Sequence, residues 1–265
     1  MIRAEKGEDV LFLQRLSEMV SVCCERYTPK FTHFLDGRAL RLVKQYLDES
    51  KDAVIAVSYG GFEGSERCKI GVFPKDVYGY DGFCESELYE MFDLAAVEIC
   101  GSGFSSFSHR DILGSVLGLG IKRETLGDIY VEDGGKKAYV CLDKIQAQFL
   151  VDSLEFVSRD KVKVGIVDVN KLPVPQRKFS VIQGTVASQR LDCLISLVTN
   201  ISREKAKIMI NSGLVSVNHF EETRTDYELH EGDILSVRGY GRFVLFEFGS
   251  QTRKGRNRVV VHKMI

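Results

Sequence analysis

The chain has 265 residues, of which 44% are hydrophobic and 28% are charged, and its formal net charge is −1. This length predicts two or three domains, and the composition is that of a globular protein, which excludes an intrinsically disordered chain. No apolar run approaches the roughly 20 residues that a membrane helix needs, and the charged first segment lacks the apolar stretch of a signal peptide. We therefore expect a cytoplasmic protein without a membrane partner.

The near-neutral total hides an asymmetry along the chain. Residues 1–108 contain 12 Lys and Arg against 18 Asp and Glu, a net charge of −6. Residues 109–180 contain 12 against 10, and residues 181–265 contain 12 against 9, so these parts carry +2 and +3. Such an asymmetry suggests a basic face for nucleic acid and a separate role for the acidic part. We expect nucleic acid to bind the basic parts and a protein partner to bind the acidic N-terminal domain.

The seven cysteines lie at positions 23, 24, 68, 84, 100, 141 and 193. Their number is odd and there is no Cys-x-x-Cys pair, so the pattern favours reduced thiols over disulfides or a zinc site. We expect neither a metal nor another cofactor.

The first 90 residues combine helical and β-like patterns. Helices are predicted at 9–27 and 37–49 and strands at 53–59 and 68–73, because the apolar spacing changes from a helical period to short β-like runs. A glycine-containing segment, residues 60–67, joins the two strands. Residues 1–90 are therefore predicted to form an N-terminal α+β domain.

The middle part, residues 91–170, has a different order of elements. Strands are predicted at 95–100, 128–131, 137–142 and 162–169, with helices at 109–117 and 143–158. Ser108 is a suitable cap for the first helix, and Ile145, Phe149, Leu150, Leu154 and Val157 are predicted to face inward from the second. The order β-α-β-β-α-β is typical of the ferredoxin-like fold, which RNA-recognition domains share with many enzymes. The third strand offers one aromatic residue, Tyr139, where base-stacking sheets present two or three, so contact through loops and helix ends is expected.

A linker is predicted at residues 171–184, which include Pro173 and Pro175, before a C-terminal domain at residues 185–265. In that domain Ser188 and Ser202 are predicted to cap two short helices, and Gly213 stands where a left-handed residue ends the second. Short strands are predicted at 214–218 and 234–238.

Motifs in this last part resemble the S-four domain, also called the αL domain. The matching positions are Arg190-Leu191-Asp192, Ser202-Arg203, Ala206, Ile210, Gly213, Val215, Val217-Asn218, Gly232-Asp233 and Val237-Arg238-Gly239. The resemblance implies that a helix-turn-helix face binds structured RNA. The fold class is thus predicted as α+β, with an N-terminal α+β unit, a ferredoxin-like (RNA-recognition-like) middle domain and a C-terminal S-four RNA-binding domain.

The basic residues of this domain are compatible with that role. Arg203 and Lys207 are an i, i+4 pair on one helix, and backbone N–H groups after Ser202 suit a phosphate. The candidate RNA-binding residues of the domain are Arg190, Ser202, Arg203, Lys205, Lys207, Asn218, Arg238, Arg242, Arg253, Lys254 and Arg256. Solvated surface charge remains the alternative explanation for any single one.

The whole chain resembles the bacterial YlmH family of S-four-domain proteins. The residues that carry the resemblance are 60–67, His109-Arg110-Asp111-Ile112-Leu113-Gly114, 118–124 and Gly127-Asp128-Ile129. It implies a factor that binds ribosomal RNA or tRNA on the large ribosomal subunit, in rescue or quality control of stalled translation. It also adds His109, Arg110, Lys122 and Arg123 as candidate RNA-binding residues. Genes of the family are associated with cell division, for which this sequence shows no physical basis.

Catalytic alternatives lack their motifs. His109-Arg110-Asp111 has Val116 where a protein kinase needs Asn, and Arg190-Leu191-Asp192 lacks the residues that follow the catalytic Asp of pseudouridine synthases. Gly101-Ser102-Gly103 lacks the third glycine of a nucleotide-binding turn. We therefore predict a protein that is not an enzyme and has no catalytic residues; the alternatives are an RNA-modifying enzyme or an adaptor that links RNA binding to cell division.

Overall fold

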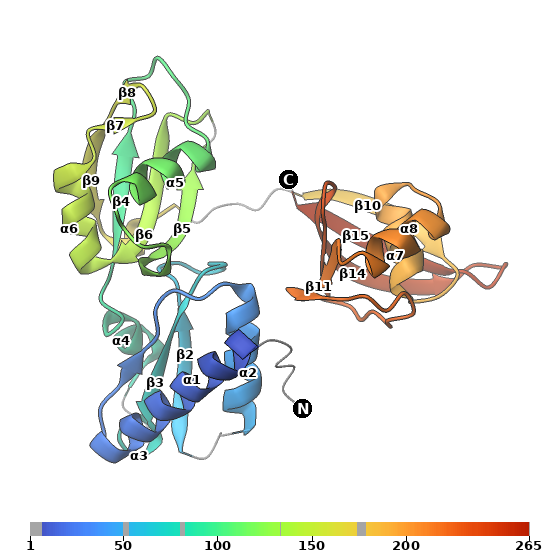
Figure 1. Cartoon of the computed structure of the whole chain (residues 1–265), viewed down its shortest axis with the longest axis horizontal. Helices are drawn as coiled ribbons and strands as arrows, with labels where there is room; N and C mark the ends of the chain where they lie inside the picture. The colour runs from blue at the N-terminus through green and yellow to red at the C-terminus, as the bar shows by residue number, and fades with distance from the viewer. Residues whose placement is uncertain (1–6, 50–52, 80–82, 133, 174–178, 265) are drawn as a thin grey trace. The chain divides into compact units, whose positions relative to one another are not determined.

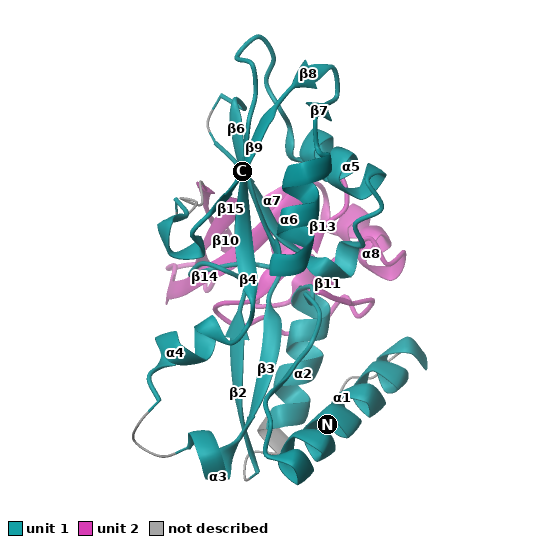
Figure 2. Ribbon diagram, turned by 90° about the vertical axis from the view of Figure 1, so that its left-hand side faces the viewer, with its two compact units in different colours: residues 1–175 teal, residues 176–265 magenta. Residues whose placement is uncertain are grey.

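The computed structural model describes residues 7–49, 53–79, 83–132, 134–173 and 179–264. It divides into two compact units, residues 1–175 and residues 176–265 (Figure 2). The boundary falls inside the predicted linker. The two parts that the sequence separates at residue 90 both belong to the first unit.

The first part of unit 1 is a three-stranded sheet with helices on both faces. Its elements are α1 (Gly7–Arg26), β1 (Lys30–Phe31), α2 (Gly37–Glu49), β2 (Val54–Tyr59), β3 (Lys69–Pro74), α3 (Lys75–Tyr78) and α4 (Glu85–Glu90). The strands pair antiparallel in the order β1-β3-β2. Leu16, Cys23 and Val43 of α1 and α2 pack against one face, and Leu88 of α4 joins Phe73 and Phe92 on another cluster.

The second part of unit 1 contains a four-stranded antiparallel sheet. Its elements are β4 (Leu94–Cys100), α5 (His109–Gly118), η1 (Arg123–Thr125), β5 (Leu126–Val131), β6 (Lys137–Asp143), α6 (Lys144–Ser153), β7 (Phe156–Val157), β8 (Asp160–Lys161), β9 (Lys163–Val167) and η2 (Val169–Lys171). The strand order is β5-β6-β4-β9. Helices α5 and α6 lie on one face (Figure 1), where Ile112, Val116 and Leu150 form a core with the sheet. This is the β-α-β-β-α-β order that the sequence predicts.

The second helix of this part is shorter than predicted. It ends at Ser153, Leu154 is already extended, and β7 and β8 form a hairpin where the sequence suggested helix. Leu154 and Val157 are buried as expected, but the prediction that Ile145 and Phe149 face inward is wrong, since they are 78% and 45% exposed. The reason is that Val157 belongs to a strand, so counting it as helical shifts the apparent apolar face.

Unit 2 is a six-stranded antiparallel sheet with two helices on one face. Its elements are β10 (Phe179–Val186), α7 (Leu191–Thr199), α8 (Arg203–Asn211), β11 (Val215–Val217), β12 (Phe220–Glu221), β13 (Ile234–Val237), β14 (Gly241–Gln251) and β15 (Asn257–Met264). The order is β10-β15-β14-β13-β11-β12. Leu191, Leu194 and Ile210 of the helices pack against Phe243 and Leu245 of the sheet.

Two local features at the start of unit 2 differ from the sequence prediction. Residues 179–184, assigned to the linker, form most of β10 and pair with β15. Nearby prolines and largely exposed side chains conceal this strand, and its partner lies far along the chain. The cap of α7 is Arg190 and not Ser188, whose Oγ lies 3.5 Å from Cys193 Sγ.

The predicted ends of α8 are confirmed. Ser202 Oγ accepts a hydrogen bond from the backbone N–H of Lys205, and Gly213 adopts a φ of +68°, which favours glycine. The N–H of Leu214 then donates to the carbonyl of Met209 at 3.1 Å. These caps fix where the second helix of the pair begins and ends.

The cysteines and the helices show no sign of a disulfide, a metal site or a membrane span within the described residues. All seven cysteines are free. Within the described ranges, no three His, Cys, Asp or Glu side chains are grouped so as to hold a metal ion. None of the helices that the structure describes is long and apolar enough to cross a membrane.

Candidate nucleic-acid interface

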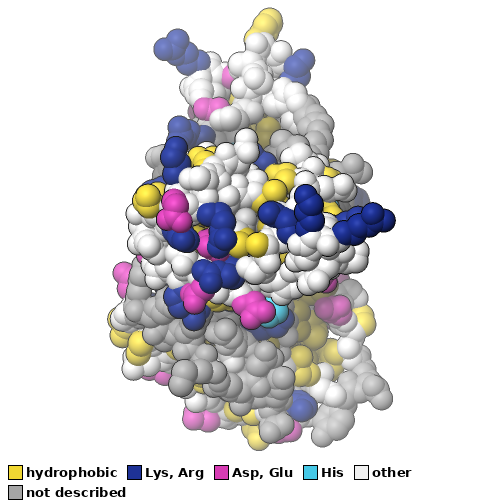
Figure 3. Space-filling model, turned by 90° about the vertical axis from the view of Figure 1, so that its right-hand side faces the viewer, with side chains coloured by type: hydrophobic (Ala, Val, Ile, Leu, Met, Phe, Trp, Pro, Cys, Tyr) yellow, Lys and Arg dark blue, Asp and Glu magenta, His cyan; other side chains and the backbone are white. Residues whose placement is uncertain are grey.

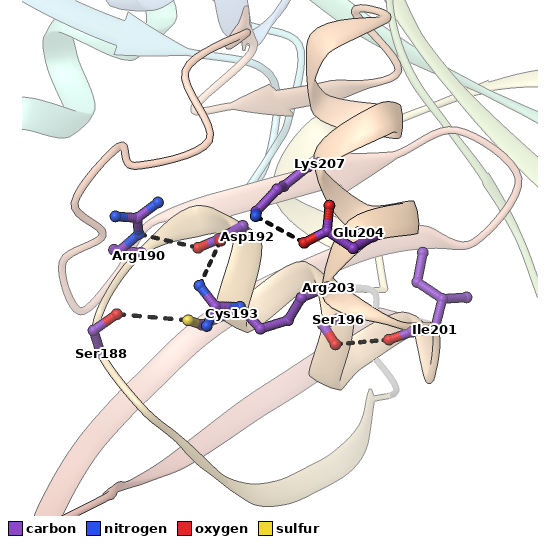
Figure 4. A network of polar contacts seen from close by, with 9 residues as sticks. All are labelled: Ser188, Arg190, Asp192, Cys193, Ser196, Ile201, Arg203, Glu204 and Lys207. Atoms are coloured by element: carbon purple, nitrogen blue, oxygen red, sulfur yellow. Dashed lines mark hydrogen bonds and ion pairs between the residues drawn. The ribbon is translucent and has the colours of Figure 1, made fainter.

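A buried carboxylate organises the start of the helix pair in unit 2. Asp192, in the first turn of α7, is fully buried. Its Oδ2 accepts a hydrogen bond from Arg203 Nη2 at 2.6 Å, and its Oδ1 accepts one from Arg190 Nε at 3.2 Å (Figure 4). The N–H of Asp192 donates to the carbonyl of Thr225 at 3.1 Å, which anchors its backbone. We call these three side chains, Arg190, Asp192 and Arg203, the Asp192 clamp.

The electrostatics of the clamp keep all three groups charged. Burial acts to raise the pKa of Asp192, but hydrogen bonds and charges from Arg203 and Arg190 outweigh it and lower that pKa below its usual value. The bond to Asp192 raises the pKa of Arg203 in turn. The clamp therefore carries one net positive charge with a fixed geometry.

The two arginines are oriented and remain accessible. Their side chains are 41% exposed for Arg190 and 49% exposed for Arg203. A guanidinium has five N–H donors, and each of these arginines uses one of them on Asp192. The remaining donors are available to phosphate oxygens, which a guanidinium can bind in a bidentate way.

The other basic residues of α8 are less constrained. Lys205 is exposed, whereas Lys207 Nζ lies 2.9 Å from Glu204 Oε1 on the same helix. Glu204 is 80% exposed, so this pair is a surface ion pair of small energetic weight. Arg203 and Lys207 are thus on one helix as predicted, but each has an acidic partner.

Asn218 and Arg238 lie on turns that follow strands of the sheet, and Arg242 lies in β14. Asn218 Nδ2 donates to Asp233 Oδ1 at 2.6 Å, and its Oδ1 accepts from the N–H of Ile234 at 3.0 Å. These bonds stabilise the turn that follows β11, so Asn218 has a structural role there. Arg238, after β13, is exposed, and Arg242 is half-buried opposite Ser236.

A basic hairpin connects β14 and β15. Arg253 and Lys254 are exposed at its tip. Arg256 is tied to β10, since its Nη2 donates to the carbonyl of Thr185 at 2.7 Å and its Nε to Thr185 Oγ1 at 3.1 Å. Figure 3 shows Lys and Arg side chains gathered in a band on the face turned to the viewer, with a few acidic side chains among them.

A second arginine cluster lies in unit 1, where motifs far apart in sequence meet. The carboxylate of Asp128 accepts hydrogen bonds from the N–H groups of Glu66 and Arg67, at 2.6 and 3.2 Å. The guanidinium of Arg67 donates to the carbonyls of Leu126, Phe34 and Arg123, at 2.9, 3.1 and 3.2 Å. We call Arg67, Arg123 and Asp128 the arginine joint, because they tie the two parts of unit 1 together.

This joint changes the interpretation of Arg123. Its Nη1 donates to the carbonyls of Leu126 and Gly127, at 3.2 and 3.3 Å, and burial lowers its pKa. These contacts occupy the side chain inside the protein. The expectation that Arg123 is presented to RNA is therefore not supported by its position, and its visible role is structural.

The remaining candidates of unit 1 are His109, Arg110 and Lys122. His109, in the first turn of α5, is exposed, although crowding by protein atoms and then the charge of Arg123 lower its pKa. Arg110 is exposed and lines an open groove of about 600 Å³. Lys122 is 77% exposed and 4.0 Å from Glu124. Arg110 and Lys122 are the candidates that this unit presents most openly.

The face of the four-stranded sheet opposite α5 and α6 is a poor platform for stacking bases. Tyr139 is buried, its hydroxyl donates to Glu132 at 3.2 Å, and burial raises its pKa to about 12. Glu98 pairs with Lys137 at 3.1 Å on a neighbouring strand. Two carboxylates on this face repel phosphate, which fits the expectation of contact through loops and helix ends.

Comparisons with known proteins agree with one another. Residues 89–171 match the family model described as "Putative RNA-binding domain in YlmH". Over 259 residues the chain is 30% identical to "Ribosome-associated protein quality control protein P2" of Bacillus subtilis (strain 168), a match that covers 97% of this chain and 96% of that protein. The chain belongs to the YlmH family.

The YlmH fold is also found among solved structures. "Cell division protein ylmH from Streptococcus pneumoniae" matches with a TM-score of 0.51 and 22% identity, and the match covers 64% of this chain and 98% of that chain. At this identity the likeness concerns the fold alone. It is consistent with the α+β class that the sequence predicts, and the sheets of the structure are antiparallel.

Sequence reasoning overlooked one residue of this YlmH protein that the geometry makes central. Asp192 belongs to the Arg190-Leu191-Asp192 motif but is not among the predicted RNA-binding residues. The available signal was the pairing of Arg190 and Asp192 two residues apart at the start of a helix.

Proposed function

We propose that this YlmH-family protein is a non-catalytic factor that binds ribosomal RNA, tRNA or both on the large ribosomal subunit and acts in the rescue or quality control of stalled translation. The family's RNA-binding domain and the name of the Bacillus subtilis relative support RNA binding in association with the ribosome. The resemblance to the YlmH family implies the large subunit, and the geometry of unit 2 supports the binding of structured RNA.

The observation that carries the proposal is the Asp192 clamp. Arginines that bind RNA phosphates lose less side-chain entropy when they are already oriented, and a buried carboxylate that binds two of them supplies that orientation. Structured RNA is recognised largely by shape through phosphates and 2′-hydroxyls, which accept hydrogen bonds from such donors. Within this proposal, residues 91–170 are a ferredoxin-like domain and residues 185–265 an S-four domain.

The enzyme alternative is less favoured by the same residues. A catalytic aspartate must reach its substrate, whereas Asp192 is fully buried and occupied by two arginines. The clamp therefore suits binding and not nucleophilic chemistry.

The test is association of the full-length protein with purified large ribosomal subunits over a range of salt concentrations. Replacing Arg190 and Arg203 by Gln is expected to weaken binding and to reduce the slope of log affinity against log salt by roughly 0.7–0.9 for each lost phosphate contact. Arg38→Gln is the matched control, because Arg38 also lies 2.6 Å from a buried aspartate, Asp9, but in the acidic unit. A slope unchanged in the double variant would place the RNA-binding face elsewhere.

Sedimentation of the tagged protein from cell lysate provides the cellular counterpart. Co-migration with free large subunits at low salt, lost at high salt, is the expected result. A protein that stays at the top of the gradient at both salt concentrations would contradict the ribosomal part of the proposal.

A further inference from the structure

The outer face of the sheet in unit 2 carries exposed apolar side chains. In β10, β15 and β14, alternate residues face either the helices or the opposite side. Val259, Val261, Phe243 and Leu245 are buried in the core beneath α7 and α8. The intervening residues point the other way, and Phe179, Val181 and Phe246 are 48%, 55% and 55% exposed.

Three rings on this outer face form a row across neighbouring strands. Phe179 of β10 stacks on His262 of β15, with ring centroids 5.2 Å apart and planes inclined by 17°. His262 stacks on Phe246 of β14 at 4.5 Å and 22°. We call Phe179, His262 and Phe246 the aromatic row. Among the described residues no further ring stacks on Phe179 or Phe246, and both are about half exposed, so each ring is partly accessible to a planar ligand.

The charges around the row indicate the kind of ligand. Arg242 and Arg258 lie on strands β14 and β15 at positions that alternate to the same face. The hairpin that joins these strands adds Arg253, Lys254 and Arg256 and contains no acid, while Glu247 is the one acid on the described outer face of these strands. In Figure 1 this hairpin projects beyond the rest of the unit.

An apolar peptide or a second sheet would match the rings but not this excess of positive charge. Unpaired nucleotides match both features, because bases stack on aromatic rings and phosphates pair with Lys and Arg. Strands β10 and β15 pair without a register shift, and β14 pairs with β15 on both sides of an irregularity between Leu245 and Glu247, so backbone hydrogen bonds hold the strands that carry the three rings.

We propose that the aromatic row and the basic hairpin form a second RNA site, which takes unpaired nucleotides on the face of the sheet opposite the helix pair. A base extends the row by stacking on the accessible ring of Phe246 or Phe179, and the phosphates of the bound chain contact Arg258, Arg253 and Lys254. Every base has a stacking face, so the site tolerates sequence variation. The inference rests on the proposed RNA-binding function and adds the class of RNA that this second surface takes.

The test uses fluorescently labelled hexauridine and the full-length protein, with binding followed by anisotropy. Phe246→Ala is expected to weaken hexauridine binding by roughly 5- to 150-fold, the range for loss of one stacked base, while Phe246→Tyr keeps the ring and stays within about twofold of the original affinity. Phe246 is exposed, so neither change removes a core contact, and the urea midpoint checks that the fold is retained.

Parallel measurements with large ribosomal subunits separate this inference from the proposed function. Subunit binding that is normal without any hexauridine binding would overturn the second site and leave the proposed function intact. Equal hexauridine affinity for the Ala and Tyr variants would also overturn it. If neither hexauridine nor large ribosomal subunits bind, the proposed function is contradicted, and the second site with it. Hexauridine binding that depends on Phe246 and persists in the Arg203→Gln variant is the result that supports two separate sites.

Discussion

Two clusters in this protein each contain two arginines and one aspartate, but the arginine N–H groups of the two clusters contact different acceptors. In the arginine joint of unit 1, Arg67 donates to three backbone carbonyls and Arg123 to two. In the Asp192 clamp of unit 2, Arg190 and Arg203 each make one bond to a buried carboxylate and remain about half exposed. A guanidinium whose donors are used internally stabilises the fold, whereas one held by a single bond can bind a partner.

The largest expected effect is on the stability of unit 1. Arg67→Ala removes three hydrogen bonds, to the carbonyls of Leu126, Phe34 and Arg123, so we expect the free energy of unfolding of unit 1 to fall by about 3 kcal/mol. Urea denaturation of the full chain measures it. Affinity for large ribosomal subunits should stay unchanged below the unfolding transition. A loss under about 1 kcal/mol would mean that the joint contributes little.

A smaller loss of stability is expected in unit 2. Arg203→Gln removes the shorter of the two bonds to Asp192, but Arg190 remains and Arg203 is half exposed, so the expected loss is about 1–2 kcal/mol. The same variant should bind large ribosomal subunits more weakly. If stability fell and binding did not, the clamp would resemble the joint, and the contrast between the two clusters would fail.

The clamp also predicts a pH dependence. The folded-state pKa of Asp192 is lowered, so its stabilising contribution is present above the unfolded value, about 3.9, and is lost as pH falls through the folded value. The difference in unfolding free energy between the original protein and Asp192→Asn should therefore be full at neutral pH and shrink in strongly acidic solution. Denaturation at a series of pH values tests this, and a difference that grows on acidification would contradict it.

The smallest effect is expected at Lys207. Its ion pair with the exposed Glu204 is worth about 0–0.5 kcal/mol, so Lys207→Ala should leave the urea midpoint nearly unchanged. The affinity for RNA should fall by no more than the loss of one phosphate contact would cause. A large loss of stability would show that this residue has a role in the core of the helix pair.

Local signals in the sequence predicted local structure well. Helix α8 begins after Ser202 and ends before Gly213 as predicted, since a cap depends on residues only three or four positions away. The role of Arg123 could not be predicted in this way, because it depends on Arg67, whose bond to Leu126 joins residues 59 positions apart. Strand β10 was missed for the same reason, as its pairing with β15 brings Phe179 beside Met264. The aromatic row could not be predicted either, because it depends on the same strand pairing.

The measurement that tests the central claim most directly is the affinity of Asp192→Asn for purified large ribosomal subunits. Removing a negative charge from a basic surface should strengthen RNA binding if net charge alone decides it. If Asp192 acts by orienting Arg190 and Arg203, the neutral variant should instead bind roughly 5- to 30-fold more weakly, which corresponds to about 1–2 kcal/mol. Weaker binding by a variant that is still folded is the predicted result, and unchanged or tighter binding would contradict the account.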